Sequence, residues 1–138
     1  MHWMLMPLRR YADFSGRSRR REYWMFVLFN LLIGLAVWTL LALTYLAGMS
    51  ETEMTTVLTP VFVLYALVAL GFAIPGLAVT VRRLHDTDRS GWSLLLGLIP
   101  LVGAIVLLVF YCTEGTAGPN RFGPDPKADD RLGAETFA

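Results

Sequence analysis

Three long apolar blocks, residues 24–47, 57–81 and 92–112, contain no acidic residue, no basic residue and no histidine. A helix needs about 20 apolar residues to cross the hydrocarbon core of a bilayer, which is about 30 Å thick. Helices of soluble proteins rarely run this long without a polar face. The hydrophobic share of 55% also exceeds the ~45–50% of soluble domains. The blocks therefore predict an all-α polytopic membrane protein with three transmembrane helices in a single domain, residues 1–138.

The third block contains two helix-breaking residues, Pro100 and Gly103, in the stretch "LGLIPLVGAIV". A proline removes a backbone donor and clashes with the preceding turn. Neighbouring helices can satisfy the freed carbonyl, which predicts a kinked spanning helix. The alternative is a re-entrant hairpin that turns at Pro100–Gly103. Pro75 and Gly76 in the second block leave a similar choice between a simple kink and a hinge.

Basic residues at the ends of the blocks predict the orientation of the chain. The amino-terminal segment, residues 1–22, and the connection 82–91 are rich in arginine, whereas the connection "GMSETEMTT" carries only glutamates. The positive-inside rule therefore places the amino terminus and residues 82–91 on the cytoplasmic side of a bacterial inner membrane. Three spans would then put the tail, residues 113–138, in the periplasm. A re-entrant third block would return the tail to the cytoplasm.

The connection "RRLHDTDRSGWS", residues 82–93, concentrates charge between two apolar blocks. Its His-Asp pair suggests a metal site, but the chain has only two histidines and one cysteine, Cys112, at the far end of the third block. A zinc site needs at least three suitable protein ligands, so we expect no metal site and no cofactor. Ser90 and Ser93 follow His85 and Asp86 too closely to indicate a catalytic triad.

Two interpretations of this connection stay open. In the first, the arginines extend to the lipid headgroups, Asp86 or Asp88 caps the next helix, and Ser90-Gly91 makes the turn. In the second, the connection meets the arginines before the first block, Arg17, Arg19, Arg20 and Arg21, and binds an anionic headgroup through bidentate contacts. The candidate headgroup-binding residues are Arg17, Arg20, Arg82, Arg83, His85, Asp86 and Arg121.

Three motifs carry a family resemblance: "FSGRSRRREYW" at residues 14–24, "RRLHDTDRSGW" at 82–92 and "GTAGPNRFGPDP" at 115–126. In order and spacing they resemble the YhaH-like small bacterial inner-membrane proteins, a domain of unknown function (805). The resemblance covers nearly the whole chain. It implies a multi-pass inner-membrane protein and supplies no reaction, substrate or cofactor.

The function predicted from these features is a non-catalytic lipid-binding, interaction or envelope accessory component, with anionic membrane lipids as partners. A homo-oligomer or other membrane proteins are further candidate partners. The alternative is a subunit of an oligomeric transporter or channel, which would need polar groups in the middle of the membrane. A lipid-modifying enzyme is a weaker alternative. Nucleic acid is not expected, because the net charge is only +1 and the arginines lie at membrane boundaries.

Overall fold

The structure is a computed structural model, described here for residues 2–128. Those residues contain no β-strand apart from an isolated bridge between Asn120 and Gly123, so the predicted all-α class is confirmed. The helices, in chain order, are α1 (His2–Arg9), α2 (Arg20–Leu46), α3 (Glu51–Asp86), the short 3-10 helix η1 (Gly91–Leu98) and α4 (Val102–Cys112).

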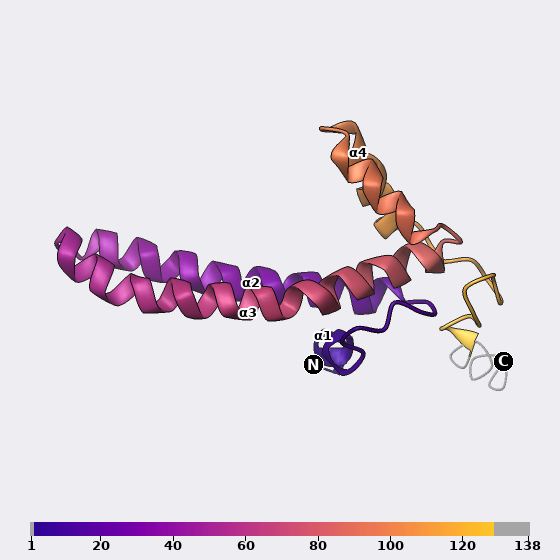
Figure 1. Ribbon diagram of the computed structural model, residues 1–138, viewed down its shortest axis with the longest axis horizontal. Coiled ribbons are helices and arrows are strands. Elements are labelled where there is room, and N and C mark those ends of the chain that lie inside the picture. The colour runs from indigo at the N-terminus through magenta and orange to yellow at the C-terminus, as the bar shows by residue number, and fades with distance from the viewer. Residues whose placement is uncertain (1, 129–138) are drawn as a thin grey trace, which may run out of the picture.

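Helices α2 and α3 form a long antiparallel hairpin (Figure 1). The turn between them uses Gly48 at φ +67°, a backbone conformation that suits glycine. Ser50 and Glu53 then form a reciprocal capping box at the start of α3, which satisfies backbone donors that the first turn leaves open. The prolines of α3, Pro60 and Pro75, lie inside one continuous helix.

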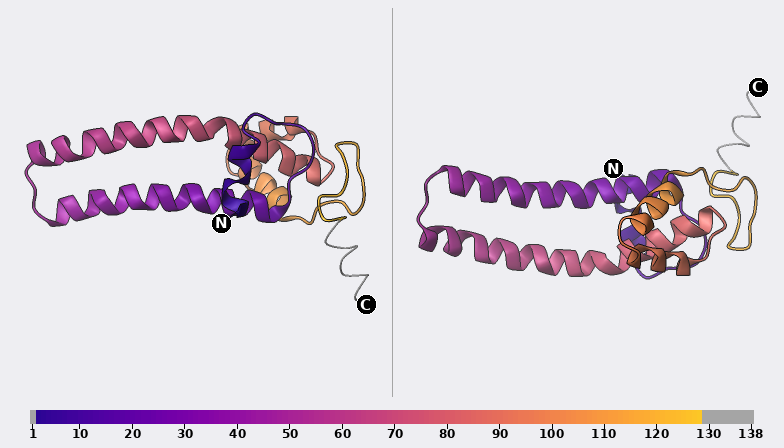
Figure 2. Two further views of the ribbon diagram at one scale, coloured as in Figure 1. Left: turned by 90° about the horizontal axis from the view of Figure 1, so that it is seen from below. Right: turned by 90° about the horizontal axis from the view of Figure 1, so that it is seen from above.

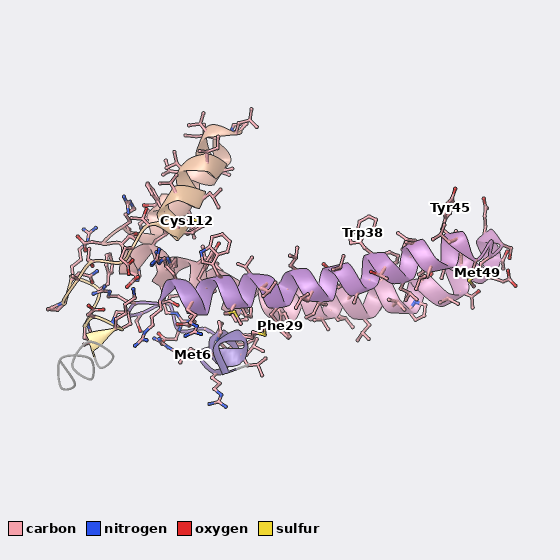
Figure 3. All side chains as sticks on the ribbon, turned by 180° about the vertical axis from the view of Figure 1, so that it is seen from behind. Met6, Phe29, Trp38, Tyr45, Met49 and Cys112 are labelled. Carbon is pink, nitrogen blue, oxygen red and sulfur yellow. The ribbon has the colours of Figure 1, made fainter. Side chains whose placement is uncertain are left out.

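Both long helices present apolar side chains to the outside. Only 6% of the most apolar stretch of each helix is buried, whereas the core helix of a soluble protein would be mostly buried. Figure 3 shows Trp38 and Tyr45 projecting away from the pair, and their exposed fractions are 69% and 75%. Helices α2 and α3 are thus long and apolar enough to cross a membrane.

The third block does not form one spanning helix. Helix η1 ends at Leu98, the chain reverses through Pro100 and Leu101, and α4 begins at Val102. With 11 residues, α4 is about 16 Å long, about half the thickness of the hydrocarbon core. The third block therefore has the hairpin form that the re-entrant alternative predicts, because Pro100 and the positive φ of Leu101, 61°, interrupt the helix instead of bending it.

The hairpin of η1 and α4 is held by a close backbone approach at Gly103. A Cβ atom at this position would lie 1.7 Å from the carbonyl oxygen of Leu96, so only glycine fits. The two helices leave the α2–α3 pair obliquely (Figure 1). The turn of the hairpin is apolar and open, with Leu98 80% and Leu101 82% exposed.

The charged segments of the chain gather at one end of the α2–α3 pair (Figure 2). We call this end the head and define it as residues 10–22, 82–91 and 113–128. The predicted connection 82–91 is shorter in the structure, because its first residues, 82–86, still belong to α3, which ends at Asp86. Arg83 and His85 lie in the last turn of α3, where positive charge is favourable. The cap of η1 is Ser90, not Asp86 or Asp88.

Within the head, the described part of the tail, residues 113–128, packs directly against residues 10–22 and 82–91. The amide of Thr116 donates to the carbonyl of Asp86 at 2.8 Å, and Arg17 donates to the carbonyl of Thr116 at 2.6 Å. The tail was predicted to lie across the membrane from residues 82–91, but in the structure residues 113–128 lie beside them, and the physical reason is the reversal at Pro100. Residues 129–138 of the predicted tail lie outside the described residues.

Helix α1 packs across α2 and α3 next to the head (Figure 2). Pro7 is fully buried inside this short helix, and the hydroxyl of Tyr11 donates to the carbonyl of Gly71 at 2.7 Å. The core beneath it joins α2, α3 and α4 through Tyr23, Phe26, Val79, Leu84, Leu107 and Tyr111. The rings of Tyr23 and Tyr111 lie 4.7 Å apart, which fixes α4 against the start of α2.

Candidate functional site: the arginine cluster of the head

Asp86 is the centre of a buried ion-pair cluster. Its carboxylate accepts from Arg17 Nε at 3.0 Å and from Arg83 Nη1 at 2.5 Å. The side chains of Arg17, Arg83 and Asp86 are 1%, 0% and 4% exposed. Removing charges from water is unfavourable unless they are paired and hydrogen-bonded. Here one carboxylate pairs with two guanidinium groups, so their other donors need further acceptors. Burial lowers the pKa of Arg83, and the neighbouring Asp86 opposes that shift.

The remaining donors of Arg17 and Arg83 bind backbone carbonyls. Arg83 donates to the carbonyls of Tyr111, at 3.2 Å, and of Thr113. Arg17 donates to the carbonyl of Gly118 at 2.6 Å, besides its bond to Thr116. Tyr111 lies in the last turn of α4 and Thr113 is its C-cap, where helices leave acceptors without an internal partner; Thr116 and Gly118 follow in the tail. The two arginines therefore attach the end of α4 and the tail to α3.

Gly115 is required for this arrangement. A Cβ atom there would lie 2.1 Å from Oδ2 of Asp86, closer than any side chain allows. The glycine thus lets the tail backbone pass directly over the buried carboxylate.

Arg82 occupies a second buried position, one residue before Arg83 on α3. It is 0% exposed and pairs with Glu22 at 3.2 Å, while its Nη1 atom lies 3.9 Å from Asp13. Within residues 2–128, Arg82 Nε and Nη1 and the hydroxyl of Ser18 have no hydrogen-bond partner. Burial lowers the pKa of Arg82, and Glu22 opposes the shift. This pair connects α2 to α3.

His85 and Arg121 hold the far part of the tail. The His85 ring stacks on Phe122, with centroids 3.9 Å apart, and its Nδ1 atom lies 3.2 Å from the carbonyl of Gly16. Arg121 pairs with Asp88 at 3.1 Å. Burial, opposed by the Gly16 carbonyl and aided by Arg121, lowers the pKa of His85.

Of the predicted headgroup-binding residues, the structure brings Arg17, Arg83 and Asp86 together and buries them. Arg82 is buried apart from them, and His85 and Arg121 contact the tail. Arg20 differs, because its side chain is 42% exposed and it pairs with Glu114 at 2.7 Å. The contacts of the buried arginines favour the structural interpretation for those residues. The headgroup-binding role itself stays a prediction.

The predicted candidates did not include other basic residues near Arg20, and nothing in the sequence indicated that Lys127 lies among them. Arg19, Arg20, Arg21 and Lys127 line one hollow at the head. Lys127 comes from the tail, which was expected on the other side of the membrane, so no local signal pointed to this grouping. Among the described residues no cluster of three or more histidine, cysteine or acidic side chains could hold a metal ion.

Comparison with known proteins identifies the family. The family described as "Protein of unknown function (DUF805)" matches residues 11–124. The chain belongs to this family. Inner membrane protein YhaI of Escherichia coli strain K12 is 46% identical over 127 residues, which cover 92% of this chain and 97% of that protein.

Two further relatives come from the same strain. Inner membrane protein YhaH is 43% identical over 129 residues, covering 94% of this chain and 99% of that protein. Uncharacterized protein YiiR is 31% identical over 149 residues, covering 86% of this chain and 92% of that protein. No solved structure matches the chain.

These matches confirm the family resemblance seen in the three sequence motifs. Two relatives are inner-membrane proteins by name, and α2 and α3 are long and apolar enough to span a bilayer. The predicted class, an integral membrane protein of unknown function, is confirmed. The relatives' names assign no ligand or reaction to the family.

Proposed function

We propose that this protein is a non-catalytic, multi-pass component of the bacterial inner membrane that binds anionic phospholipid at its cytoplasmic face. Its transmembrane part is the α2–α3 hairpin, and the η1–α4 hairpin enters the membrane from the cytoplasmic side without crossing it. The amino-terminal segment and the tail both lie in the cytoplasm. This orientation is supported by the positive-inside rule and by the contacts of residues 113–128 with residues 10–22 and 82–91.

One observation carries the lipid-binding proposal. Arg20 and Arg21 lie in the first turn of α2, where the apolar span begins. Both are on the surface of the protein: the Arg20 side chain is 42% exposed and Arg21 is also exposed. Basic side chains at this depth gain about 1 kcal/mol each from anionic headgroups. The buried arginines, by contrast, already bind carboxylates and carbonyls of the protein.

Polar groups within the spans give less support to the transporter alternative. Asn30 donates to the carbonyl of Phe26, Thr39 to that of Leu35 and Thr80 to that of Gly76. Each donor therefore binds its own helix, one turn earlier, instead of facing a pathway for a polar substrate.

Native mass spectrometry tests the proposal. Protein in detergent is mixed with equal amounts of phosphatidylglycerol and phosphatidylcholine, and the lipids that remain attached are counted. We expect preferential retention of phosphatidylglycerol that weakens as salt is raised, because surface electrostatics are screened. Equal retention of the two lipids would contradict the proposal.

A further inference from the structure

Two hollows lie side by side at the start of α2 and share two arginines. The first, of about 340 Å³, is lined only by basic residues: Arg19, Arg20, Arg21 and Lys127. The second, of about 410 Å³, is lined by Arg20, Arg21, Trp24, Met25 and Cys112. A cationic hollow thus continues directly into a largely apolar one.

Helix geometry explains the order of the two hollows. Trp24 follows Arg20 by four residues and Arg21 by three, and Met25 follows Arg21 by four, so these side chains share one face of α2. One helical turn advances about 5.4 Å. The apolar hollow is therefore one turn deeper in the membrane than the cationic hollow. This matches the order of headgroup and acyl chain in a phospholipid.

Other elements complete the walls of this double hollow. Arg20 donates to the carbonyl of Cys112, at the end of α4, at 3.0 Å, and Figure 3 shows Cys112 at the base of that helix. Lys127 reaches the cationic hollow from the tail. The re-entrant path of the third block is what brings both residues to the start of α2.

Only basic side chains line the cationic hollow, and Arg21 among them is open to solvent. Glu114 pairs with Arg20 and with Lys127, so one carboxylate holds two of the four basic side chains in place. Arg21 is exposed and makes no ion pair with a described residue. An anionic group is therefore the complementary occupant, and the apolar hollow below it requires that this group carry a hydrocarbon chain.

We propose that the two hollows form one binding site for an anionic glycerophospholipid. Its phosphate lies among Arg19, Arg20, Arg21 and Lys127, and the first part of an acyl chain lies against Trp24 and Met25. The site rests on the proposed function and makes it specific. It differs from the buried arginine cluster, of whose predicted members it contains only Arg20.

Arg21→Ala tests the cationic half, and Arg9→Ala is the matched control. Both arginines are exposed on the head side, and each change removes one positive charge, but Arg9 does not line the hollow. We expect Arg21→Ala to weaken phosphatidylglycerol retention in native mass spectrometry about fivefold, the effect of about 1 kcal/mol. Arg9→Ala should have a smaller effect. Equal losses in both variants would show that the charge acts diffusely and would overturn the site.

Trp24→Ala tests the apolar half, with Trp38→Ala as its control. Trp38 is exposed on the same helix, nearer the opposite end, so both changes remove one indole. Only Trp24→Ala should weaken phosphatidylglycerol retention. Glycerol phosphate, which is a headgroup without chains, should not compete with the lipid at equal concentration. Effective competition would indicate a site for free phosphate and would also overturn the proposal.

Cys112 supplies a readout that needs no mutation. It is exposed and is the single cysteine of the chain, and it lines the apolar hollow. Added phosphatidylglycerol, but not phosphatidylcholine, should slow its alkylation by N-ethylmaleimide. Protein that prefers phosphatidylglycerol without this protection would overturn the site and leave the proposed function intact. Protein without any lipid preference would contradict the proposed function itself.

Discussion

Arginine geometry explains how this chain can bury so much charge. A guanidinium presents five donors in a planar fork, and Arg83 uses that fork to bind one carboxylate and two backbone carbonyls at once. The ammonium of lysine is a single point donor and cannot span these acceptors. The carbonyls lie at the end of α4, so the same contacts that satisfy the donors of Arg83 also cap that helix.

Asp86→Asn is the most informative single change in the cluster. The amide keeps the shape of the side chain but removes the charge between two buried guanidinium groups. Breaking a buried ion pair from one side costs about 3–5 kcal/mol. We expect a loss of this size in the free energy of unfolding, measured by thermal or denaturant unfolding in detergent.

Asp88→Asn is the matched control for this change. Its side chain is 47% exposed and pairs with the exposed Arg121. An exposed ion pair contributes up to about 1 kcal/mol, so this variant should unfold almost as the parent does. Similar losses in the two variants would mean that burial of Asp86 is not what makes it important.

The sequence predicted the residues of the head better than their roles. It singled out Arg83, His85 and Asp86 because charge between apolar blocks is unusual, and Arg17 because it belongs to the arginines before the first block. It could not show that Arg17 and Asp86, 69 residues apart, form an ion pair. Long-range pairing depends on the path of the whole chain, and no local pattern contains it. The same holds for Lys127, whose approach to the first turn of α2 depends on the reversal at Pro100.

Helices were predicted well where apolar length alone decides, and less well where the chain reverses. The ends of α2 lie close to the ends of its apolar block. Helix α3 extends beyond its block at both ends, because a capping box stabilises its start and basic residues stabilise its last turn. In the third block, Pro100 predicted a break but not its form. A kink and a reversal use the same proline, and the choice depends on the contact between Gly103 and Leu96.

Gly103→Ala tests that contact. The added methyl group would meet a backbone carbonyl that cannot move without opening the hairpin. We expect a loss of more than about 2 kcal/mol in the free energy of unfolding and faster amide hydrogen exchange in residues 91–112, because the hairpin opens locally.

Gly97→Ala provides the comparison within the same hairpin. Its added Cβ would lie 3.3 Å from Cδ1 of Leu107, the end of a flexible side chain that can shift. This variant should keep nearly the stability and exchange rates of the parent. Unchanged exchange in Gly103→Ala would show that the hairpin tolerates a side chain at its crossing point.

The molecule as a whole combines a long apolar hairpin with a polar head at one end (Figure 2). Positive charge predicted which segments belong together: the amino-terminal arginines and residues 82–91 are indeed in contact. The sequence prediction sent the tail to the far side because it counts three spans and because the mixed charge of the tail gives little guidance. The contacts of the tail with Arg17, Asp86 and Asp88 favour a re-entrant third block over a third span.

Cysteine labelling in intact cells tests the resulting topology. In a Cys112→Ser background, Ala128→Cys should react with a membrane-impermeant maleimide only after the membrane is opened, because the tail is attached to the cytoplasmic head. Ser50→Cys, at the turn between α2 and α3, should react from outside. Leu101→Cys, at the apolar turn of the re-entrant hairpin, should react poorly in both conditions, since thiols within the hydrocarbon region are hard for a polar reagent to reach. If Ala128→Cys and Ser50→Cys both react in sealed cells, the third block crosses the membrane. In that case the protein in the membrane cannot contain the contacts between the tail and Asp86.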